Sequence, residues 1–428
     1  MSRDGQSAIV AKRTATRPVR TEEIRALCAS AGLDVVGERT QVRPPDPTYG
    51  LGEGAVADVA DQVDREDVDV VVVDDDLDPE QAFSLQEAVG AEVVDRTRLV
   101  LDVFADRAAT RRARLEVRLA ERRYELPRAE ARARRGENSS RRGFRGGGES
   151  VAAQLRADYK QRIHDLEAEL DQLDDRDEDA RSRRHEAGFD LVALAGYTNA
   201  GKSTLLCRLA DDLDVDANDR RHDDLAETAA SRDRLFETLD TTTRRATVGD
   251  RRVLLTDTVG FVSDLPHWLM SSFRTTLSAA READAVLLVV DATDDPETVR
   301  ENVETSLAAL DDREGALVPV LNKCDAASDL DAKREAVAAL AEDPVAISAS
   351  EGGGIGGLQA AVRDALTDLE TVRLSVPNTD DGNAFVSWCH DRGTVRDADY
   401  GDSVDFELEA RPEVVAQAAG RAEQLGGD

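Results

Sequence analysis

A short glycine-rich stretch, G-Y-T-N-A-G-K-S-T at residues 196–204, has residue types and spacing that suit phosphate binding. Gly196, Gly201, Lys202 and Ser203 fit the pattern G-x-x-x-x-G-K-S, between an apolar run and a predicted helix. Glycines let backbone N–H groups wrap phosphate oxygens, the lysine neutralises the β- and γ-phosphates, and the serine hydroxyl ligates Mg²⁺. We therefore predict a nucleoside triphosphate site. Its predicted contacts here are Gly196, Tyr197, Thr198, Asn199, Ala200, Gly201, Lys202, Ser203 and Thr204.

A second motif, N-K-C-D at residues 322–325, predicts the base. It follows a predicted strand. The carboxylate of its last residue, Asp325, can accept hydrogen bonds from guanine N1–H and N2–H₂, a donor pair that adenine lacks. The motif S-A-S at 348–350 follows the next strand and suits backbone contacts to guanine O6. We therefore expect a guanine nucleotide. The predicted contacts are Asn322, Lys323, Cys324, Asp325, Ser348, Ala349 and Ser350.

A third motif, D-T-V-G, comprises Asp257, Thr258, Val259 and Gly260. The aspartate can hold Mg²⁺ through water, and the glycine N–H can sense the γ-phosphate. The next residue is Phe261, where many GTPases carry a glutamine that orients the attacking water. We therefore assign no catalytic residue, and expect hydrolysis to be slow alone or completed by a group from elsewhere. A phenylalanine that only packs under the phosphate loop would also leave the water unpositioned.

The segment L-F-E-T-L-D-T-T-T-R-R at 235–245 is predicted to complete the Mg²⁺ shell with a threonine hydroxyl when GTP is bound. Residue chemistry alone does not rank its candidates, which are Thr238, Thr241, Thr242 and Thr243.

The elements that must position these motifs alternate between strands and helices, as in α/β folds. Over 1–105, strands are predicted at 8–11, 34–37 and 68–74, and a helix at 21–32. Over 188–368, strands are predicted at 189–195, 253–256, 285–291, 316–321 and 344–348. The tail has strand patterns at 371–376 and 404–410 with two short helical patterns. We expect an N-terminal α/β domain at 1–105, a second α/β domain at 188–370 and a small α+β domain at 371–428.

The segment at 106–187 has a different character. A helix is predicted from 107 to about 126, and apolar residues at three- and four-residue spacing predict a second helix over 155–173, packed against the first as a hairpin. An arginine- and glycine-rich loop, expected to be mobile, is predicted between them at 127–150. Residues 107–145 contain fourteen arginines and five glutamates, a net charge of +9. This cluster is a candidate contact for a phosphate backbone, although part of it could be a solvated helix face.

The composition bounds the class of protein. The net charge is −33, with only five lysines and fifty arginines. Such a surface could serve a basic partner, but this balance is more typical of a cytoplasmic, halophilic protein in molar salt, where the Debye length is only ~3 Å. Four scattered cysteines indicate a reducing compartment, and we expect neither a signal peptide nor a membrane span.

Together the motifs resemble the HflX family of ribosome-associated GTPases. The resemblance runs through the phosphate loop, L-F-E-T-L-D, T-D-T-V-G-F-V-S-D-L-P-H at 256–267 and N-K-C-D. Upstream it includes P-D-P-T-Y-G-L-G at 45–52, D-R-T-R-L-V-L-D-V-F-A-D-R-A at 95–108 and R-R-Y-E-L-P-R at 122–128. The segment 211–233 is longer and more acidic than the corresponding connection in the family.

The resemblance implies a P-loop G domain, an N-terminal α/β HflX domain, a helical hairpin and a small C-terminal α+β domain. It implies a protein that binds GTP with Mg²⁺ and the large ribosomal subunit, and that couples hydrolysis to ribosome dissociation or rescue. We expect this protein to be a monomer. It favours Thr238 beside Ser203 as Mg²⁺ ligand. It also adds further nucleotide contacts, namely Phe236, Glu237, Thr238, Leu239 and Asp240. Two alternatives are a GTP-regulated RNA-binding module acting away from ribosomes and a binding-only switch.

Overall fold

The computed structural model describes residues 3–15, 19–140, 148–210, 242–249, 251–258, 260–261, 266–270 and 279–426. Side chains are described for all of these except 136–140, 148–152, 174–180, 267 and 270. The chain forms two compact units. The first contains the described residues up to Leu173 together with α9 (His267–Met270), and the second contains the other described residues.

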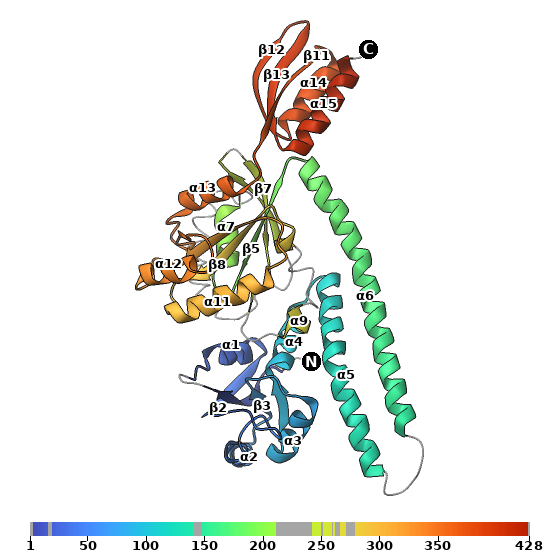
Figure 1. Ribbon diagram of the computed structural model, residues 1–428, viewed down its shortest axis with the longest axis vertical. Helices are drawn as coiled ribbons and strands as arrows, with labels where there is room; N and C mark the ends of the chain where they lie inside the picture. The colour runs from blue at the N-terminus through green and yellow to red at the C-terminus, as the bar shows by residue number, and fades with distance from the viewer. Residues whose placement is uncertain are drawn as a thin grey trace. The chain divides into compact units, whose positions relative to one another are not determined.

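The first unit begins with a four-stranded parallel sheet (Figure 1). Its strands, in spatial order, are β2 (Leu33–Val42), β1 (Gln6–Thr14), β3 (Val70–Val73) and β4 (Glu92–Asp95). Its helices are α1 (Glu22–Ser30), α2 (Glu53–Glu66), α3 (Pro79–Val89) and α4 (Arg96–Arg107). All four valines of β3 are buried, which explains why this strand reads as an uninterrupted apolar run. The three predicted strands and the predicted helix of this region are confirmed.

Two long helices complete the first unit: α5 (Arg111–Ser140) and α6 (Gly148–Glu186), whose last part lies in the second unit. Leu115 and Leu119 of α5 pack with Leu170 of α6. Ion pairs add to this contact, including one of 2.7 Å between Arg123 and Glu167. The predicted pairing of the helices is thus confirmed in the described residues.

The predicted start of the loop at residue 127 was wrong, because α5 continues through Pro127 to Ser140. A proline removes one backbone hydrogen bond from a helix interior, but side-chain contacts hold this turn. The Arg128 guanidinium lies 3.5 Å from the Tyr124 ring centroid and donates to Asp95, at 2.5 Å. Tyr124 Oη donates to the same carboxylate at 2.9 Å. Tertiary contacts here outweigh the local preference of proline.

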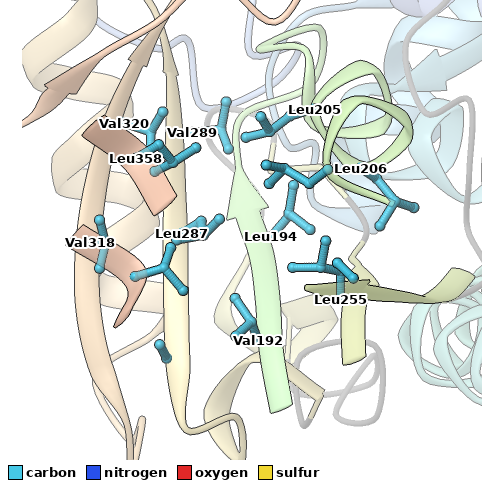
Figure 2. Packing of buried hydrophobic residues seen from close by; sticks show 14 of the residues in the cluster. Val192, Leu194, Leu205, Leu206, Leu255, Leu287, Val289, Val318, Val320 and Leu358 are labelled. Carbon is cyan, nitrogen blue, oxygen red and sulfur yellow. The ribbon is translucent and has the colours of Figure 1, made fainter. Parts of the chain in front are cut away.

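The second unit contains a six-stranded sheet in which only β6 is antiparallel to its neighbour. The spatial order is β10 (Val345–Ala346), β9 (Ala316–Asn322), β8 (Ala285–Asp291), β5 (Asp190–Gly196), β7 (Arg251–Asp257) and β6 (Thr242–Val248). The helices are α7 (Lys202–Leu209), α11 (Pro296–Ala309), α12 (Leu330–Ala338) and α13 (Ile355–Ala365). Figure 2 shows Leu194 of β5 beside Leu205 and Leu206 of α7, in the core that fixes the helix against the sheet.

The five predicted strands of this region are present, but the last is shorter than expected, with only Val345 and Ala346 paired to β9. The strand β6 was not predicted. Its sequence, T-T-R-R-A-T-V, is mostly polar because it lies at the edge of the sheet and has one buried face.

The C-terminal part of the second unit has a three-stranded antiparallel sheet in the order β11 (Glu370–Pro377), β13 (Ser403–Ala410) and β12 (Thr394–Tyr400). Its helices are α14 (Asp380–His390) and α15 (Pro412–Gly426). The two predicted strands and two predicted helices are confirmed, whereas β12 was missed. Most of its residues are exposed and polar, so it lacks the alternation that identifies a half-buried strand.

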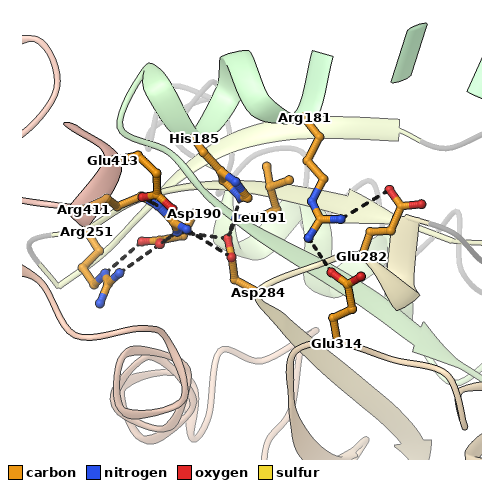
Figure 3. Close-up of polar contacts among 10 residues, drawn as sticks. All are labelled: Arg181, His185, Asp190, Leu191, Arg251, Glu282, Asp284, Glu314, Arg411 and Glu413. Carbon is orange, nitrogen blue, oxygen red and sulfur yellow. Dashed lines mark hydrogen bonds and ion pairs between the residues drawn. The ribbon is translucent and has the colours of Figure 1, made fainter. Parts of the chain in front are cut away.

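A buried ion cluster joins this part to the six-stranded sheet (Figure 3). Asp190, at the start of β5, accepts from Arg251 at 2.8 Å and pairs with Arg411, which precedes α15. Asp284, just before β8, lies 3.1 Å from Arg411 and 3.2 Å from His185 of α6. Such a cluster is stable only when its charges are paired, so it fixes these elements together. Among the described residues, no helix is long and apolar enough to cross a membrane.

Candidate nucleotide site

The phosphate loop connects the carboxyl end of β5 to the first turn of α7, where backbone N–H groups point outward. Two of its glycines are required by close approach. Gly196 has φ +138°, and a Cβ there would lie 2.1 Å from the Val289 carbonyl oxygen. Gly201 has φ +90°, and a Cβ would lie 2.3 Å from Asn322 Nδ2. Any side chain at either position would displace the loop from its neighbouring strands.

Lys202 is buried under this loop. Its Nζ donates to the carbonyl oxygens of Gly196, at 3.0 Å, and Tyr197, at 2.8 Å. Burial lowers the pKa of Lys202 to about 8, against the opposing charge of Asp257. The backbone carbonyl dipoles thus hold the ammonium within the loop. Negative phosphate oxygens bound there would stabilise its charged form.

Ser203 and Asp257 come together across the loop. Ser203 Oγ donates to Asp257 Oδ2 at 2.7 Å, and Asp257 is buried at the end of β7. A hydroxyl and a carboxylate are the hard oxygen donors that Mg²⁺ prefers. The pair therefore fits a metal held by Ser203 directly and by Asp257 through water, which would neutralise phosphate charge beside the loop.

The predicted third contributor to the metal, Thr238, lies outside the described residues, as do Thr241, Phe236, Glu237, Leu239, Asp240 and Val259. Two of the open candidates are described. Thr242 of β6 pairs in register with Asp257, and Thr243 shares a hydrogen bond of 3.0 Å with Thr256. Residue chemistry does not rank these four threonines. Of the two that the structure describes, Thr242 begins a strand beside Asp257, which hydrogen-bonds to Ser203.

Phe261 is fixed to the phosphate loop by its backbone. Its N–H donates to Gly196 O at 3.0 Å and its carbonyl accepts from Thr198 N at 2.9 Å. Only 3% of the residue is exposed. Gly260 beside it approaches so closely that a Cβ would lie 2.9 Å from Lys202 Nζ. Phe261 therefore packs under the loop, and this position offers no side-chain group to orient water.

Thr258 and Asn199 serve the shape of the site. Thr258 is buried and donates from Oγ1 to Leu194 O at 2.7 Å, which fixes the end of β7 to β5. Asn199 is exposed and has φ 63°, a left-handed conformation that asparagine tolerates better than most residues. Ala200 is buried and Thr204 is half-buried.

The N-K-C-D motif reaches the same place from the end of β9. Asn322 is buried, donates from Nδ2 to Ala200 O at 2.8 Å and accepts from Ala349 N–H at 2.9 Å. Lys323 has φ 62°, and its Nζ lies 2.5 Å from Asp291. Asp325 is exposed, so its carboxylate is accessible to a ligand. The structure thus brings the phosphate loop and this motif together.

The S-A-S segment follows β10. Cys324 N–H donates to Ile347 O at 3.1 Å, which keeps this segment beside N-K-C-D. Ser348 is buried and its Oγ accepts from Glu351 N–H at 3.1 Å. Ser350 is exposed, and its Oγ lies 3.2 Å from that of Ser348.

One residue that positions this segment was missed. Arg208 of α7 donates from Nε to Ala349 O at 2.9 Å and also hydrogen-bonds to Ser350 O. It connects the helix after the phosphate loop to the segment predicted to contact guanine. Nothing in the sequence marked it, because one arginine on a helix has no diagnostic spacing.

Several arginines of the arginine-rich segment already have partners within the protein. Arg134 pairs with Glu130 at 3.3 Å, and Arg135 pairs with Glu80 at 2.8 Å. Arg132 and Arg135 both lie over the Phe83 ring. Arg141, Arg142 and Arg145 lie outside the described residues.

Three family models match the chain. Residues 19–105 match a family described as GTP-binding GTPase N-terminal, and residues 107–184 match GTP-binding GTPase Middle Region. Residues 191–323 match a family described as 50S ribosome-binding GTPase. The last match contains the phosphate loop, the D-T-V-G motif and the start of N-K-C-D.

Fold and site together define a P-loop GTPase. The chain is 34% identical to the GTPase HflX of Thermococcus kodakarensis over 92% of this chain and 89% of the relative. It is 33% identical to the GTPase HflX of Thermofilum pendens over 99% and 98% of the two chains. The chain belongs to the HflX family of GTPases, and the expected α/β fold and GTPase activity are confirmed. A crystal structure of SsGBP with GDP, 22% identical, aligns with a TM-score of 0.49 over 84% of this chain and 98% of that one.

Proposed function

We propose that this GTPase binds the large ribosomal subunit and couples GTP binding and hydrolysis to ribosome dissociation or rescue. The observation that carries the proposal is the match of residues 191–323 to a family described as 50S ribosome-binding GTPase. In this proposal, the nucleotide motifs change state between GTP binding and hydrolysis. The surface that contacts the ribosome responds to that change.

Phe261 supports a partner-stimulated reaction. With 3% of the residue exposed and the backbone fixed to the phosphate loop, this position cannot orient the attacking water. Hydrolysis then requires a group from elsewhere, as when a partner supplies a residue in trans. A stimulating ribosome fits this requirement.

Within the site we propose these roles. Lys202 neutralises phosphate oxygens, and Ser203 with Thr238 holds Mg²⁺, with Asp257 acting through water. Asp325 reads guanine, while Asn322 and the S-A-S segment hold the base pocket in shape. Bound Mg²⁺ would offset charge that develops on the transferred phosphoryl group.

GTP hydrolysis with and without purified large subunits tests the proposal. We expect stimulation by large subunits, little by small subunits, and none in Ser203→Ala. Turnover that is unchanged by large subunits would rule the proposal out. Binding to free RNA but not to subunits would instead favour an RNA-binding module that acts away from ribosomes. A single-turnover assay in which no GTP is hydrolysed would favour a binding-only switch.

The arginine-rich segment is the proposed ribosomal contact in the helical hairpin. We expect replacement of Arg134, Arg135, Arg141, Arg142 and Arg145 by glutamine to weaken subunit binding and leave GTP affinity unchanged. Arg134 and Arg135 already have carboxylate partners. A variant restricted to Arg141, Arg142 and Arg145 should therefore show most of this weakening of subunit binding. Equal loss of GTP affinity would show that the segment belongs to the nucleotide site.

The segments at 1–105, 106–187, 188–370 and 371–428 are proposed to act as four domains. The net charge of −33 supports a halophilic protein of a salt-rich cytoplasm, working as a monomer.

A further inference from the structure

Four arginines of the second unit lie over two aromatic rings. The guanidiniums of Arg252 and Arg245 lie 4.5 and 5.5 Å from the Phe189 ring centroid. Those of Arg392 and Arg421 lie 4.6 and 4.5 Å from the Trp388 ring centroid. We call these four residues, Arg245, Arg252, Arg392 and Arg421, the arginine ledge.

The ledge is continuous between the two rings. Burial lowers the pKa of Arg252, and the charges of Arg245 and Arg392 lower it further, while that of Asp391 opposes them. The backbone closes the same gap, because a Cβ on Gly188, next to Phe189, would lie 2.2 Å from Arg392 O. The ledge therefore runs from the β6–β7 edge of the larger sheet onto the end of α14.

Arg421 of α15 completes the ledge. Burial raises the pKa of Cys389 to about 12, and the charges of Arg421 and Arg392 both oppose this rise. Both guanidiniums therefore lie near the same thiol, beside Trp388. Arg245 and Arg421, at the two ends of the ledge, are exposed, and Arg252 and Arg392 are half-buried between them.

Within the part of the chain that the structure describes, no carboxylate forms an ion pair that would neutralise the charge of the ledge. The carboxylate whose charge acts on Arg252 is the exposed Asp391. Neighbouring arginines differ: Arg251 pairs with Asp190 at 2.8 Å, and Arg396 pairs with Glu409 at 2.6 Å. An aromatic ring orients a guanidinium without cancelling its charge. In a chain with a net charge of −33, such a group of cations is unusual.

We propose that the arginine ledge binds the phosphate backbone of folded RNA. Guanidinium forks match phosphate oxygens with two parallel hydrogen bonds, and their planes can also stack with bases. An acidic polypeptide would offer charge but no bases to stack, so the arrangement on rings favours RNA. This surface goes beyond the proposed function, since it lies outside the arginine-rich hairpin segment and its binding needs neither GTP nor an intact subunit.

The test compares two variants of the full chain with equal change of charge. The ledge variant carries Arg245→Gln, Arg252→Gln, Arg392→Gln and Arg421→Gln. The control variant replaces four exposed arginines that already pair with carboxylates, namely Arg300, Arg334, Arg363 and Arg373, by glutamine. Fluorescence anisotropy measures binding to labelled, deproteinised large-subunit RNA across a KCl series, without nucleotide.

We expect the ledge variant to bind RNA about tenfold more weakly or worse, and the control variant to change by about twofold at most. The slope of log affinity against log salt should fall by about 0.7 to 0.9 for each phosphate that the variant no longer neutralises. GTP affinity and basal hydrolysis should stay unchanged in the control variant and in the triple variant Arg252→Gln, Arg392→Gln and Arg421→Gln. The triple variant omits Arg245 because this residue ends the 235–245 segment assigned to the nucleotide site.

Equal loss in the two variants, or no loss in either, would overturn the proposal. Polyglutamate could also displace the labelled RNA as strongly, per charge, as unlabelled RNA does. That result would overturn the proposal too, because it would identify an acidic polypeptide as the ligand. If the ledge variant unfolds, the exposed pair Arg245→Gln and Arg421→Gln should still weaken binding. A ledge that binds RNA while large subunits fail to stimulate hydrolysis would sustain this inference and remove the proposed ribosomal function.

Discussion

Asn322 joins the guanine motif to the phosphate loop, because its Nδ2 donates to the Ala200 carbonyl at a distance of 2.8 Å. The same side chain accepts from Ala349 N–H at 2.9 Å. One amide therefore satisfies backbone groups of two loops that come from different strands. The spacing between the phosphate and base ends of the site depends on this residue as much as on the motifs themselves.

We expect Asn322→Ala to destabilise the protein and weaken GTP binding together. Each backbone group left unsatisfied in the interior costs about 1–3 kcal/mol, so the loss of both bonds should cost about 2–6 kcal/mol. Chemical unfolding and nucleotide titration measure the two effects.

The matched control is Asn383→Ala, because Asn383 is exposed on α14 and its side chain hydrogen-bonds to Asn378 at 3.2 Å. It should change neither quantity appreciably. A loss of GTP affinity in Asn322→Ala without any change in unfolding would contradict the bridging role and indicate direct contact with the base.

Much of this arrangement could be predicted from the sequence. The phosphate loop is a local pattern, in which Gly196 and Gly201 are required by their own backbone geometry. The central strands are apolar throughout because helices cover both faces of a parallel sheet. Local residue type therefore identifies both the strands and the loop that follows one of them.

The remaining features depend on contacts between distant residues. α5 passes Pro127 because Arg128 and Tyr124 both hold Asp95, which lies 33 and 29 positions away in the chain. Arg208 positions Ala349 across 141 positions. No local pattern carries such pairings, so propensity predicted a loop at Pro127 and spacing gave no role to Arg208.

Asp325→Asn should move the nucleotide preference from GTP toward xanthosine triphosphate. An amide cannot accept from both guanine N1–H and N2–H₂, but its N–H₂ can donate to the O2 of xanthine. Hydrogen bonds to a charged group contribute about 1.5–3 kcal/mol, so GTP affinity should fall by about tenfold to a hundredfold. Competition of the two triphosphates against a fluorescent guanine nucleotide measures the change.

Asp331→Asn, on the exposed first turn of α12, is the matched control and should leave both affinities unchanged. If Asp325→Asn bound GTP as tightly as the unmodified protein, the assignment of this carboxylate to guanine would be wrong.

Ser203→Ala should abolish most GTP hydrolysis and raise the Mg²⁺ concentration needed for the remainder. The substitution removes the hydroxyl that lies 2.7 Å from Asp257 Oδ2, and with it one oxygen donor of the proposed metal pair. Loss of this donor should cost about 2–3 kcal/mol of transition-state stabilisation, or roughly a hundredfold in rate. Initial rates across a Mg²⁺ titration provide the measurement.

Ser203→Thr retains the hydroxyl and should preserve most activity, which separates loss of the donor from disturbance of the loop. GDP affinity without Mg²⁺ should be similar in all three proteins. An unchanged Mg²⁺ dependence in Ser203→Ala would exclude this hydroxyl from the metal site.

Asp284 should make the second unit sensitive to acid. Burial by itself would raise the pKa of Asp284, but hydrogen bonds from His185 and Leu191 N–H, with the charge of Arg411, lower that pKa to about 2 from 3.8. A carboxylate with a lowered pKa in the folded state stabilises the protein above its unfolded pKa. That stabilisation, ~2 kcal/mol, disappears as the pH falls from about 4 through about 2.

Asp284→Asn removes this contribution and leaves Arg411 with one carboxylate fewer, so we expect lower stability at neutral pH. The difference from the unmodified protein should narrow as the pH approaches 2, because protonated Asp284 resembles the amide. Unfolding by urea at a series of pH values measures it. Asp312→Asn removes a carboxylate that is 79% exposed and lies 3.7 Å from Arg281, and it should show no such narrowing. A pH-independent difference for Asp284→Asn would mean that packing, rather than ionisation, gives this residue its role.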